Sequence, residues 1–240
     1  MSEEEPSYSR VLVKISGGFL GTDCSSLNRE KLDIVARQIR GLLDTGVEVC
    51  MVTGGGNLLR GASDTSLKLE RTCLDRMGML GTAINGLALA GGFEKHGIGA
   101  QVMSAVSIQL EGIQSFDAEK AIGLMSDGKV PIFVAGTGLP YFSTDTGAVV
   151  RALQVKAELL IKASRVDGVY DSDPEKNEAA TRFDRISYQR VLDLGLTVMD
   201  QSAIALCRDN ALPLAVVDLG KKNILADFID SPSLGTLIVP

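Results

Sequence analysis

The sequence contains no tryptophan and a single histidine, His96, among its 240 residues. A Ser–His–Asp triad or a zinc site would have to depend on that histidine alone. Its place just before Gly97 is instead typical of the last turn of a helix, where a positive charge is favourable. The scarcity of histidine therefore argues against acyl-transfer hydrolases and against zinc enzymes.

Long hydrophobic runs and excess positive charge are also missing. The most apolar segment, MGMLGTAINGLALAGG, is interrupted by Thr82, Asn85 and several glycines, and it is too short to span a bilayer. The 24 Lys and Arg residues, against 30 Asp and Glu, give a net charge of −6. Such a balance disfavours nucleic acid and anionic membranes as partners. An anionic substrate would have to be attracted by a local site.

The cysteines and the first ten residues of the chain indicate the same cellular compartment. The start of the chain, MSEEEPSYSR, is acidic and has no apolar core, so it does not resemble a signal peptide. The cysteines lie far apart and form no C-x-x-C pair, which is typical of single buried or half-buried thiols under reducing conditions. They are Cys24, Cys50, Cys73 and Cys207. We expect a cytoplasmic protein.

Apolar runs and helical spacings alternate along the chain. Apolar runs without polar alternation predict buried parallel strands, and apolar residues at helical spacing predict helices between them. The predicted strands span 10–16, 47–53, 101–103, 130–136, 158–164 and 212–219, with a closing TLIVP. The predicted helices span 28–45, 75–91, 117–126, a stretch after Thr144, 188–194 and 200–209. This order predicts an α/β fold with a doubly wound, mainly parallel sheet.

Two segments carry further expectations. The polar stretch 171–182 has little apolar content and is interpreted as a mobile loop. The helix around 77–90 is apolar on nearly every face, which predicts a helix buried all round, either in an ordinary core or in an oligomer interface. We see no repeat or linker, and therefore expect an acidic tail, 1–9, followed by one domain, 10–240.

A glycine triplet follows the second predicted strand, in VCMVTGGGNLLRG. Gly54, Gly55 and Gly56 stand at the carboxyl end of that strand, where open α/β sheets bind their ligands. Glycines allow an anion to approach main-chain N–H groups, and Arg60 could clamp a phosphate or carboxylate. The alternative is a plain strand-to-helix turn. Neither G-x-G-x-x-G nor G-x-x-x-x-G-K-[ST] fits the sequence.

Lysines and a second glycine-rich turn are expected at the same edge. Lys14 and Lys162 lie near the ends of two predicted strands, and Asp200 is either their partner or a simple helix cap. The turn GTGLPYFSTDTG adds hydroxyl groups, and its Thr144 or Asp145 makes a good helix cap. Such a site holds more than one phosphate and suits phosphoryl transfer, which needs positioning, Mg²⁺ and cations rather than a nucleophilic side chain.

Six blocks in register carry a resemblance to a known family. KISGG, GGGNLLRG, DRMGMLGTAINGLA, AGTGLPYFSTDTGA, KASRVDGVYDSDP and VMDQSA together resemble the bacterial uridylate (UMP) kinases of the amino acid kinase superfamily, from Arg10 to Val239. The resemblance implies transfer of the γ-phosphoryl group of ATP to UMP with Mg²⁺. It also implies a three-layer αβα sandwich, an acceptor half (about 10–150), an ATP half (about 151–240) and a homohexamer built from dimers.

The resemblance also implies a role for each matching residue. Lys14 and Lys162 would stabilise the transferring phosphoryl group, and Asp200 would orient them. Asp75 would bind the ribose of UMP, and Arg60 would hold its phosphate. The implied UMP-binding residues are Gly55, Arg60, Asp75, Thr137, Gly138, Leu139, Pro140, Tyr141, Phe142, Ser143 and Thr144. The implied ATP-binding residues are Lys14, Ile15, Ser16, Gly17, Gly56, Arg60, Ser164, Tyr170 and Asp173. No protein side chain is assigned to the metal.

The chain departs from the family pattern at several positions. Gly18 replaces a usual Glu, Leu139 replaces an Asn, and KASRVDG stands for KATKVDG. Many members carry an Arg-Asp pair where this chain has the stretch Leu89-Ala90-Gly91, and an Arg where it has Gln101. Because those arginines are expected to grip the effector GTP, we predict weak or absent activation by GTP.

Two alternatives stay open. One is a superfamily kinase that acts on another small acceptor, such as carbamate, acetylglutamate or isopentenyl phosphate. The other is a silent nucleotide or oxyanion binder.

Overall fold

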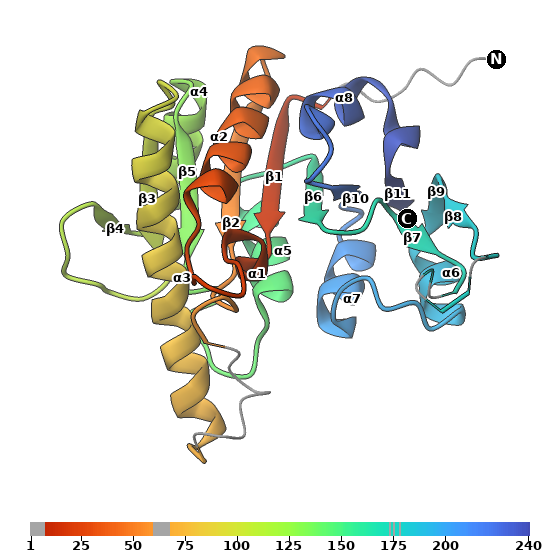
Figure 1. Ribbon diagram of the computed structural model, residues 1–240, viewed down its shortest axis with the longest axis horizontal. Coiled ribbons are helices and arrows are strands. Elements are labelled where there is room, and N and C mark those ends of the chain that lie inside the picture. The colour runs from red at the N-terminus through yellow and green to blue at the C-terminus, as the bar shows by residue number, and fades with distance from the viewer. Residues whose placement is uncertain (1–7, 60–67, 173, 175, 178) are drawn as a thin grey trace.

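The computed structural model describes residues 8–59, 68–172, 174, 176–177 and 179–240 (Figure 1). Within these residues a nine-stranded sheet has the order β4-β3-β5-β2-β1-β6-β10-β11-β9. Its paired strands run parallel except β10 and β11, which pair antiparallel. The strands are β1 (Arg10–Ile15), β2 (Glu48–Thr53), β3 (Ala100–Ser104), β4 (Ile113–Ser115), β5 (Val130–Val134), β6 (Leu159–Ser164), β9 (Arg185–Ser187), β10 (Leu214–Asp218) and β11 (Thr236–Val239).

Helices connect these strands. They are α1 (Gly17–Leu20), α2 (Arg29–Asp44), α3 (Arg71–Glu94), α4 (Ala118–Ser126), α5 (Thr144–Gln154), α6 (Tyr188–Asp193), α7 (Gln201–Asp209), α8 (Ile224–Asp230) and the 3-10 turn η3 (Pro232–Leu234). A separate antiparallel pair is formed by β7 (Val169–Tyr170) and β8 (Arg182–Phe183).

The helices cover both faces of the sheet (Figure 1). Val11 and Val13 of β1 belong to an apolar cluster that includes residues of α2, α3 and α8. Leu12 belongs to the cluster that includes residues of α4, α5, α6 and α7. Since successive strand residues point to opposite faces, the two clusters are the two interfaces of a sandwich. The predicted three-layer αβα fold with a mainly parallel, doubly wound sheet is confirmed.

Side-chain caps explain where two of the predicted helices begin. Asn28 accepts a hydrogen bond from the backbone of the first turn of α2, as predicted. For α5 the cap is Ser143, whose side chain accepts from the N–H of Thr146 at 3.1 Å. The expectation that Thr144 or Asp145 caps this helix was wrong, because these two residues already belong to its first turn.

The elements missing from the sequence-based prediction are mostly short. They are α1, β4, β7, β8, β9, α8 and η3, none longer than seven residues. Such lengths are too short to show a hydrophobic period. Most of the polar stretch 171–182 forms no helix or strand, and β8 begins at its last residue. Its mobility remains a prediction, and positions 173, 175 and 178 lie outside the described residues.

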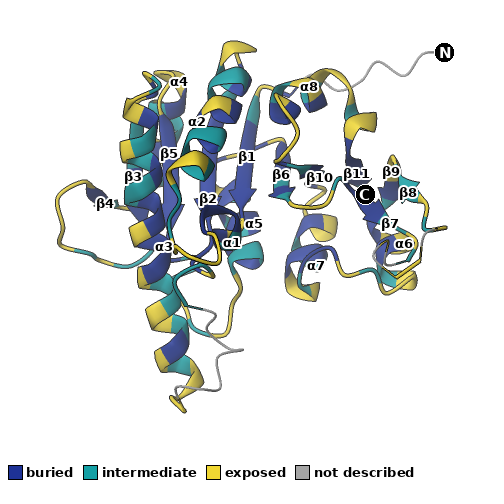
Figure 2. Cartoon of the chain, viewed as in Figure 1, coloured by how far each residue is buried: buried dark blue, intermediate teal, exposed yellow. Residues whose placement is uncertain are grey.

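Helix α3 is not buried all round. Leu80 is 55% exposed, Ile84 is 50% exposed and Met77 is 38% exposed. These three side chains follow helical spacing and therefore share one face. The N-terminal part of α3 extends beyond the neighbouring elements, and much of that part is coloured as exposed (Figure 2). The prediction of complete burial was wrong for the chain on its own, and an apolar stripe is left uncovered.

Exposure also separates the cysteines. Cys50 and Cys207 are buried, whereas Cys24 and Cys73 are exposed, so the expectation of four at least half-buried thiols was wrong for two of them. His96 follows α3, which ends at Glu94, and its Nε2 lies 3.3 Å from a carboxylate oxygen of Asp33. Among the described residues, no helix is long and apolar enough to cross a membrane.

Candidate functional site

Two lysines stand side by side on the central strands. Lys14 of β1 is the in-register partner of Lys162 of β6. Both therefore point to the same face of the sheet, the one covered by α5 and α7. Lys14 is only 7% exposed. Two neighbouring ammonium groups that are largely removed from water need a negative partner, because burial of an unpaired charge is costly.

Asp145, in the first turn of α5, supplies that negative charge. Its Oδ1 lies 2.5 Å from Nζ of Lys14, and its Oδ2 lies 3.2 Å from Nζ of Lys162. Burial on its own raises the pKa of Asp145, but the two lysines outweigh it and the pKa falls below its usual value. Burial lowers the pKa of Lys162, and Asp145 opposes that shift. Lys162 also donates to the carbonyl of Val198. The carboxylate thus bridges both cations.

Of the two roles expected for Asp200, the structure shows the helix cap. Among the described residues no ion pair joins Asp200 to either lysine, although its charge opposes the fall in the pKa of Lys162. Asp200 is the N-cap of α7 and accepts from the N–H of Ala203 at 3.1 Å. It also accepts from the hydroxyls of Ser143 and Thr146, the latter at 3.0 Å. These bonds join the start of α7 to the start of α5, next to the bridging carboxylate.

The glycine triplet lies against the start of α1, at the carboxyl ends of β1 and β2. A Cβ on Gly17 would lie 2.5 Å from the carbonyl oxygen of Gly54, and one on Gly55 would lie 2.6 Å from that of Gly78 in α3. These positions are glycine because backbones approach each other closely. A Cβ on Gly56 would meet nothing within 4 Å. Packing therefore explains Gly17 and Gly55, while Gly56 faces open space where a ligand has room.

A cavity of about 630 Å³ opens between the glycine triplet, α3 and the turn before α5. Asp75 of α3 lines it, and its Oδ2 accepts from the N–H of Tyr141 at 2.8 Å. Arg71 donates to the same carboxylate at 3.0 Å. Of the residues predicted to bind UMP, the cavity is lined by Gly55, Asp75, Thr137, Leu139, Tyr141, Phe142, Ser143 and Thr144. Gly138 and Pro140 lie in the same turn but do not line it.

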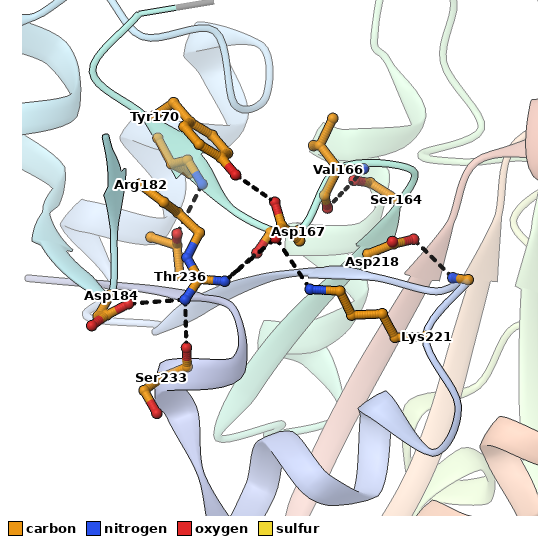
Figure 3. A network of polar contacts seen from close by, with 12 residues as sticks. Ser164, Val166, Asp167, Tyr170, Arg182, Asp184, Asp218, Lys221, Ser233 and Thr236 are labelled. Atoms are coloured by element: carbon orange, nitrogen blue, oxygen red, sulfur yellow. Dashed lines mark hydrogen bonds and ion pairs between the residues drawn. The ribbon is translucent and has the colours of Figure 1, made fainter. Parts of the chain in front are cut away.

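A second cavity, of about 550 Å³, is lined in part by Lys162. Ser164 and Tyr170, both predicted on the ATP side, line it together with Val166 and Val198. Its wall is tied down by polar contacts that converge on Asp167 (Figure 3). Lys162 therefore lines this cavity and also belongs to the lysine pair.

The structure places most of the remaining predicted residues near the ends of β1 and β2. Gly56 lines the first cavity, and Lys14, Ser16 and Gly17 lie at or just after the end of β1. The side chain of Ile15 is buried in the apolar core, so it has only its backbone to offer. Arg60 and Asp173 lie outside the described residues.

Asp145 and Thr146 are the main residues that sequence reasoning did not assign to the site. The stretch STDTG contained a signal, since an acidic residue in the first turn of a helix after a glycine-rich turn is well placed next to a sheet edge. That signal was interpreted only as a cap. Thr82 was also missed: its hydroxyl accepts from the N–H of Ala135 at 2.6 Å and so fixes the start of the glycine-rich turn before α5.

Comparison with known sequences identifies the family. A model of the amino acid kinase family matches residues 9–218. The chain belongs to the amino acid kinase family. Within that family it is similar to the uridylate kinase of Paramagnetospirillum magneticum, with 44% identity over 98% of both chains. It is also similar to the uridylate kinase of Pseudomonas putida, with 42% identity over 99% of this chain and 96% of that protein.

Solved structures of UMP kinases show the same amino acid kinase fold. The UMP kinase from Bacillus anthracis superposes with a TM-score of 0.93 at 32% identity, over 98% of this chain and 97% of that one. The UMP kinase from Ureaplasma parvum gives a TM-score of 0.90 at 35% identity, over 97% and 99% of the two chains.

Proposed function

We propose that this chain is a UMP kinase, which transfers the γ-phosphoryl group of ATP to UMP and yields UDP and ADP. The observation that carries the proposal is the pair Lys14 and Lys162, joined by Asp145 between two separate cavities. Relatives named uridylate kinase, similar over nearly their whole length, support the choice of acceptor.

The lysines act on charge that develops during transfer. Lys14 and Lys162 would contact the oxygens of the γ-phosphoryl group as negative charge spreads over it. Asp145 holds both ammonium groups in place before substrate arrives, which avoids reorganisation during the reaction. Asp200 acts one step further out, since it holds Ser143 and Thr146 around Asp145. No side chain needs to remove a proton, because the phosphate of UMP is already an anion.

UMP would occupy the cavity of about 630 Å³. Asp75 would accept hydrogen bonds from the ribose hydroxyls, Gly55 would lie beside the nucleotide, and Arg60 would hold the phosphate. The turn from Thr137 to Thr144 would surround the rest of the nucleotide: Thr137, Gly138, Leu139, Pro140, Tyr141, Phe142, Ser143 and Thr144.

ATP would occupy the cavity of about 550 Å³ with its phosphates directed toward the lysines. The adenosine would lie against Ser164, Tyr170 and Asp173. The triphosphate would pass along the ends of β1 and β2, where the proposed contacts are Lys14, the backbone of Ile15, Ser16, Gly17, Gly56 and Arg60. The chain then divides into an acceptor half, about 10–150, and an ATP half, about 151–240.

Mg²⁺ is expected to arrive on the phosphates of ATP, where it would neutralise charge. The donor set of the chain suits this arrangement: Asp145 is taken by two lysines, and Asp200 by two hydroxyls and an N–H. In this arrangement the protein would hold the metal through the nucleotide.

We further propose that the protein works in the cytoplasm as a homohexamer built from dimers. The apolar stripe of Met77, Leu80 and Ile84 supports this, because a second copy packed on α3 would cover it. Sedimentation of the purified protein, compared with an Ile84→Glu variant, tests the idea.

A coupled assay of ADP release over UMP, CMP, dTMP, carbamate, acetylglutamate and isopentenyl phosphate tests the function. We expect turnover with UMP far above the rest. Faster turnover with one of the other acceptors would contradict the proposal. No turnover with any of them would favour a silent binder.

A further inference from the structure

Asp167 is the centre of a polar network on the wall of the second cavity. It lies in the turn between β6 and β7, and Tyr170, Arg182 and Lys221 point toward it from different elements (Figure 3). The hydroxyl of Tyr170 donates to Oδ1 of Asp167 at 2.8 Å. On the other oxygen, Oδ2, Nζ of Lys221 lies at 3.1 Å and Nη1 of Arg182 at 3.6 Å. One carboxylate thus joins Tyr170, three residues further along the chain, to Arg182 and Lys221, which are 15 and 54 residues away.

Two of the residues that contact Asp167, Arg182 and Lys221, are also connected to other parts of the fold. Nη2 of Arg182 donates to the carbonyl of Ser233 at 2.7 Å, which connects β8 to η3. Lys221 comes from the turn after β10, so its contact reaches across to the central sheet. Asp167 is therefore fixed from both sides, and a side chain that depends on it is fixed as well.

The backbone next to Asp167 leaves little freedom. A Cβ on Gly168 would lie 2.5 Å from Oγ1 of Thr236 and 2.6 Å from Cδ of Arg182, so this position admits only glycine. The next residue, Val169, donates its N–H to the same Thr236 hydroxyl at 2.8 Å. The strand that carries Tyr170 is thus pressed against β11 and against the stem of Arg182.

Tyr170 is the part of the network that reaches the cavity. Tyr170, Gly168 and Val169 line it, whereas Asp167, Arg182 and Lys221 do not. The phenol has one rotatable hydroxyl, and its bond to Asp167 fixes the direction of the ring. Without the carboxylate, Arg182 and Lys221 would lose the negative charge that they share, Arg182 keeping its ion pair with Asp184, and their repulsion would spread the turn that shapes the cavity.

We infer that Asp167 is a positioning residue for the donor nucleotide: through Tyr170 and the Arg182–Lys221 pair, it holds the cavity wall in the shape that accepts the adenosine of ATP or ADP. This inference rests on the proposed function, because it takes the second cavity as the donor site. Asp167 touches neither substrate nor the lysine pair, so it acts on donor binding and leaves the acceptor site and the transfer step unchanged.

The main variant is Asp167→Asn, which keeps the shape of the side chain and removes its charge. We expect the Kd for ADP, measured by calorimetry without acceptor, to rise about tenfold, as loss of a charged hydrogen-bond partner typically does. The KM for ATP should rise by a similar factor. The KM for UMP and kcat at saturating ATP should change less than about twofold, because distant sites act independently.

Asp184→Asn is the matched control. Asp184 also pairs with Arg182, at 3.0 Å from Nη2, but it is far more exposed and does not line the cavity. Its loss removes an ion pair of the same arginine without touching Tyr170 or Lys221. The control should leave the Kd for ADP within about twofold of the wild-type value.

Two further variants keep the inference testable if Asp167→Asn fails to fold. Lys221→Met removes the ion pair between Lys221 and Asp167, and it should weaken ADP binding less than Asp167→Asn does. Tyr170→Phe removes only the hydroxyl, and combining it with Asp167→Asn should raise the Kd for ADP by less than the product of the single effects. If the double variant raises the Kd for ADP by the full product of the two single effects, Asp167 does not act through Tyr170.

The calorimetric measurement separates this inference from the proposed function. An unchanged Kd for ADP in a folded Asp167→Asn protein overturns the inference, even if the wild-type protein phosphorylates UMP. An equal rise in the KM for ATP and for UMP would also overturn it, because a general loss of stability affects both sides. Weakened ADP binding supports it whichever acceptor the enzyme uses.

Discussion

Asp145 and Lys14 form an ion pair of 2.5 Å between Oδ1 and Nζ in a part of the chain that is largely removed from water. The same carboxylate reaches Lys162 at 3.2 Å. Because the two lysines are in-register neighbours on β1 and β6, the sheet holds their positive charges close together. Asp145 of α5 supplies the negative charge that offsets their repulsion. The order of the site before substrate binds therefore depends on this bridge.

Asp145→Asn should lower kcat by on the order of a hundredfold, because small displacements of positioned catalytic groups have effects of that size. Lys14→Ala should lower kcat at least about a hundredfold, because it removes a cation aimed at the transition state. Initial rates at saturating ATP and UMP check both. Wild-type kcat in a folded Asp145→Asn protein would contradict the role of the bridge.

The free energy of unfolding should fall at low pH because Asp145 becomes protonated there. Its pKa is lowered in the folded chain, where the two lysines outweigh the effect of burial. The stabilisation is therefore present above the unfolded-chain pKa of about 3.9 and is lost as pH falls through the lower folded value. Urea unfolding between neutral pH and about pH 2 should show a shallower acid dependence for Asp145→Asn than for the wild type. Parallel curves would contradict this assignment.

Asp75→Ala should raise the KM for UMP much more than the KM for ATP. Asp75 lines only the acceptor-side cavity, where it also accepts from the N–H of Tyr141. Leaving polar groups unpaired costs about 1–3 kcal/mol, which corresponds to a change in KM of about 5-fold to 150-fold. Helix α3 begins at Arg71, so Asp75 is not its cap. Equal changes in both constants would assign Asp75 a purely structural role.

The cysteines should react in two classes with a thiol reagent. Burial raises the pKa of Cys207 to about 12 and raises the pKa of Cys50 further, so neither forms a thiolate near neutral pH. Cys24 and Cys73 are exposed. The native protein should therefore titrate at most two thiols, and the urea-unfolded protein all four. Reaction of a third thiol in the native protein would contradict the burial of Cys50 and Cys207.

GTP should activate the enzyme weakly or not at all. At the positions where the family pattern has the arginines expected to bind GTP, the chain has the stretch Leu89-Ala90-Gly91 and Gln101. The Gln101 amide already donates to the carbonyls of Val102 and Gly112, at 3.0 and 3.2 Å. An effector without differential contacts cannot shift a conformational equilibrium. Initial rates at subsaturating UMP and fixed free Mg²⁺ check this, and a severalfold rise would contradict it.

The long elements were predictable because their patterns are strong. The apolar runs of β1, β2 and β6 and the helical spacing of α2 predicted both their type and their bounds within about two residues. The short elements β4, β7, β8 and β9 were not predictable, since two or three residues show no period. Their existence depends on tertiary contacts such as the Thr236 hydroxyl that binds the N–H of Val169.

The site was partly predictable for the same reason. Lys14 and Lys162 could be placed at one edge because parallel strands end together. The choice between Asp145 and Asp200 as their partner could not be made, because it depends on how α5 and α7 rotate against the sheet. That rotation is fixed by side-chain packing and by the bonds of Ser143 and Thr146 to Asp200, which leave no trace in the local sequence.

The pairing of Lys14 with Lys162 also determines which changes of chain length the protein can survive. Deleting one residue within β1 would turn every following side chain to the opposite face and send the lysine into the wrong layer. The apolar residues of β1 would stay buried, because both faces of this strand are covered. The burial of apolar residues would thus be nearly unchanged even though the lysine had left the site. Insertions and deletions that preserve the site are therefore confined to connecting segments, and the strands themselves can diverge only by substitution.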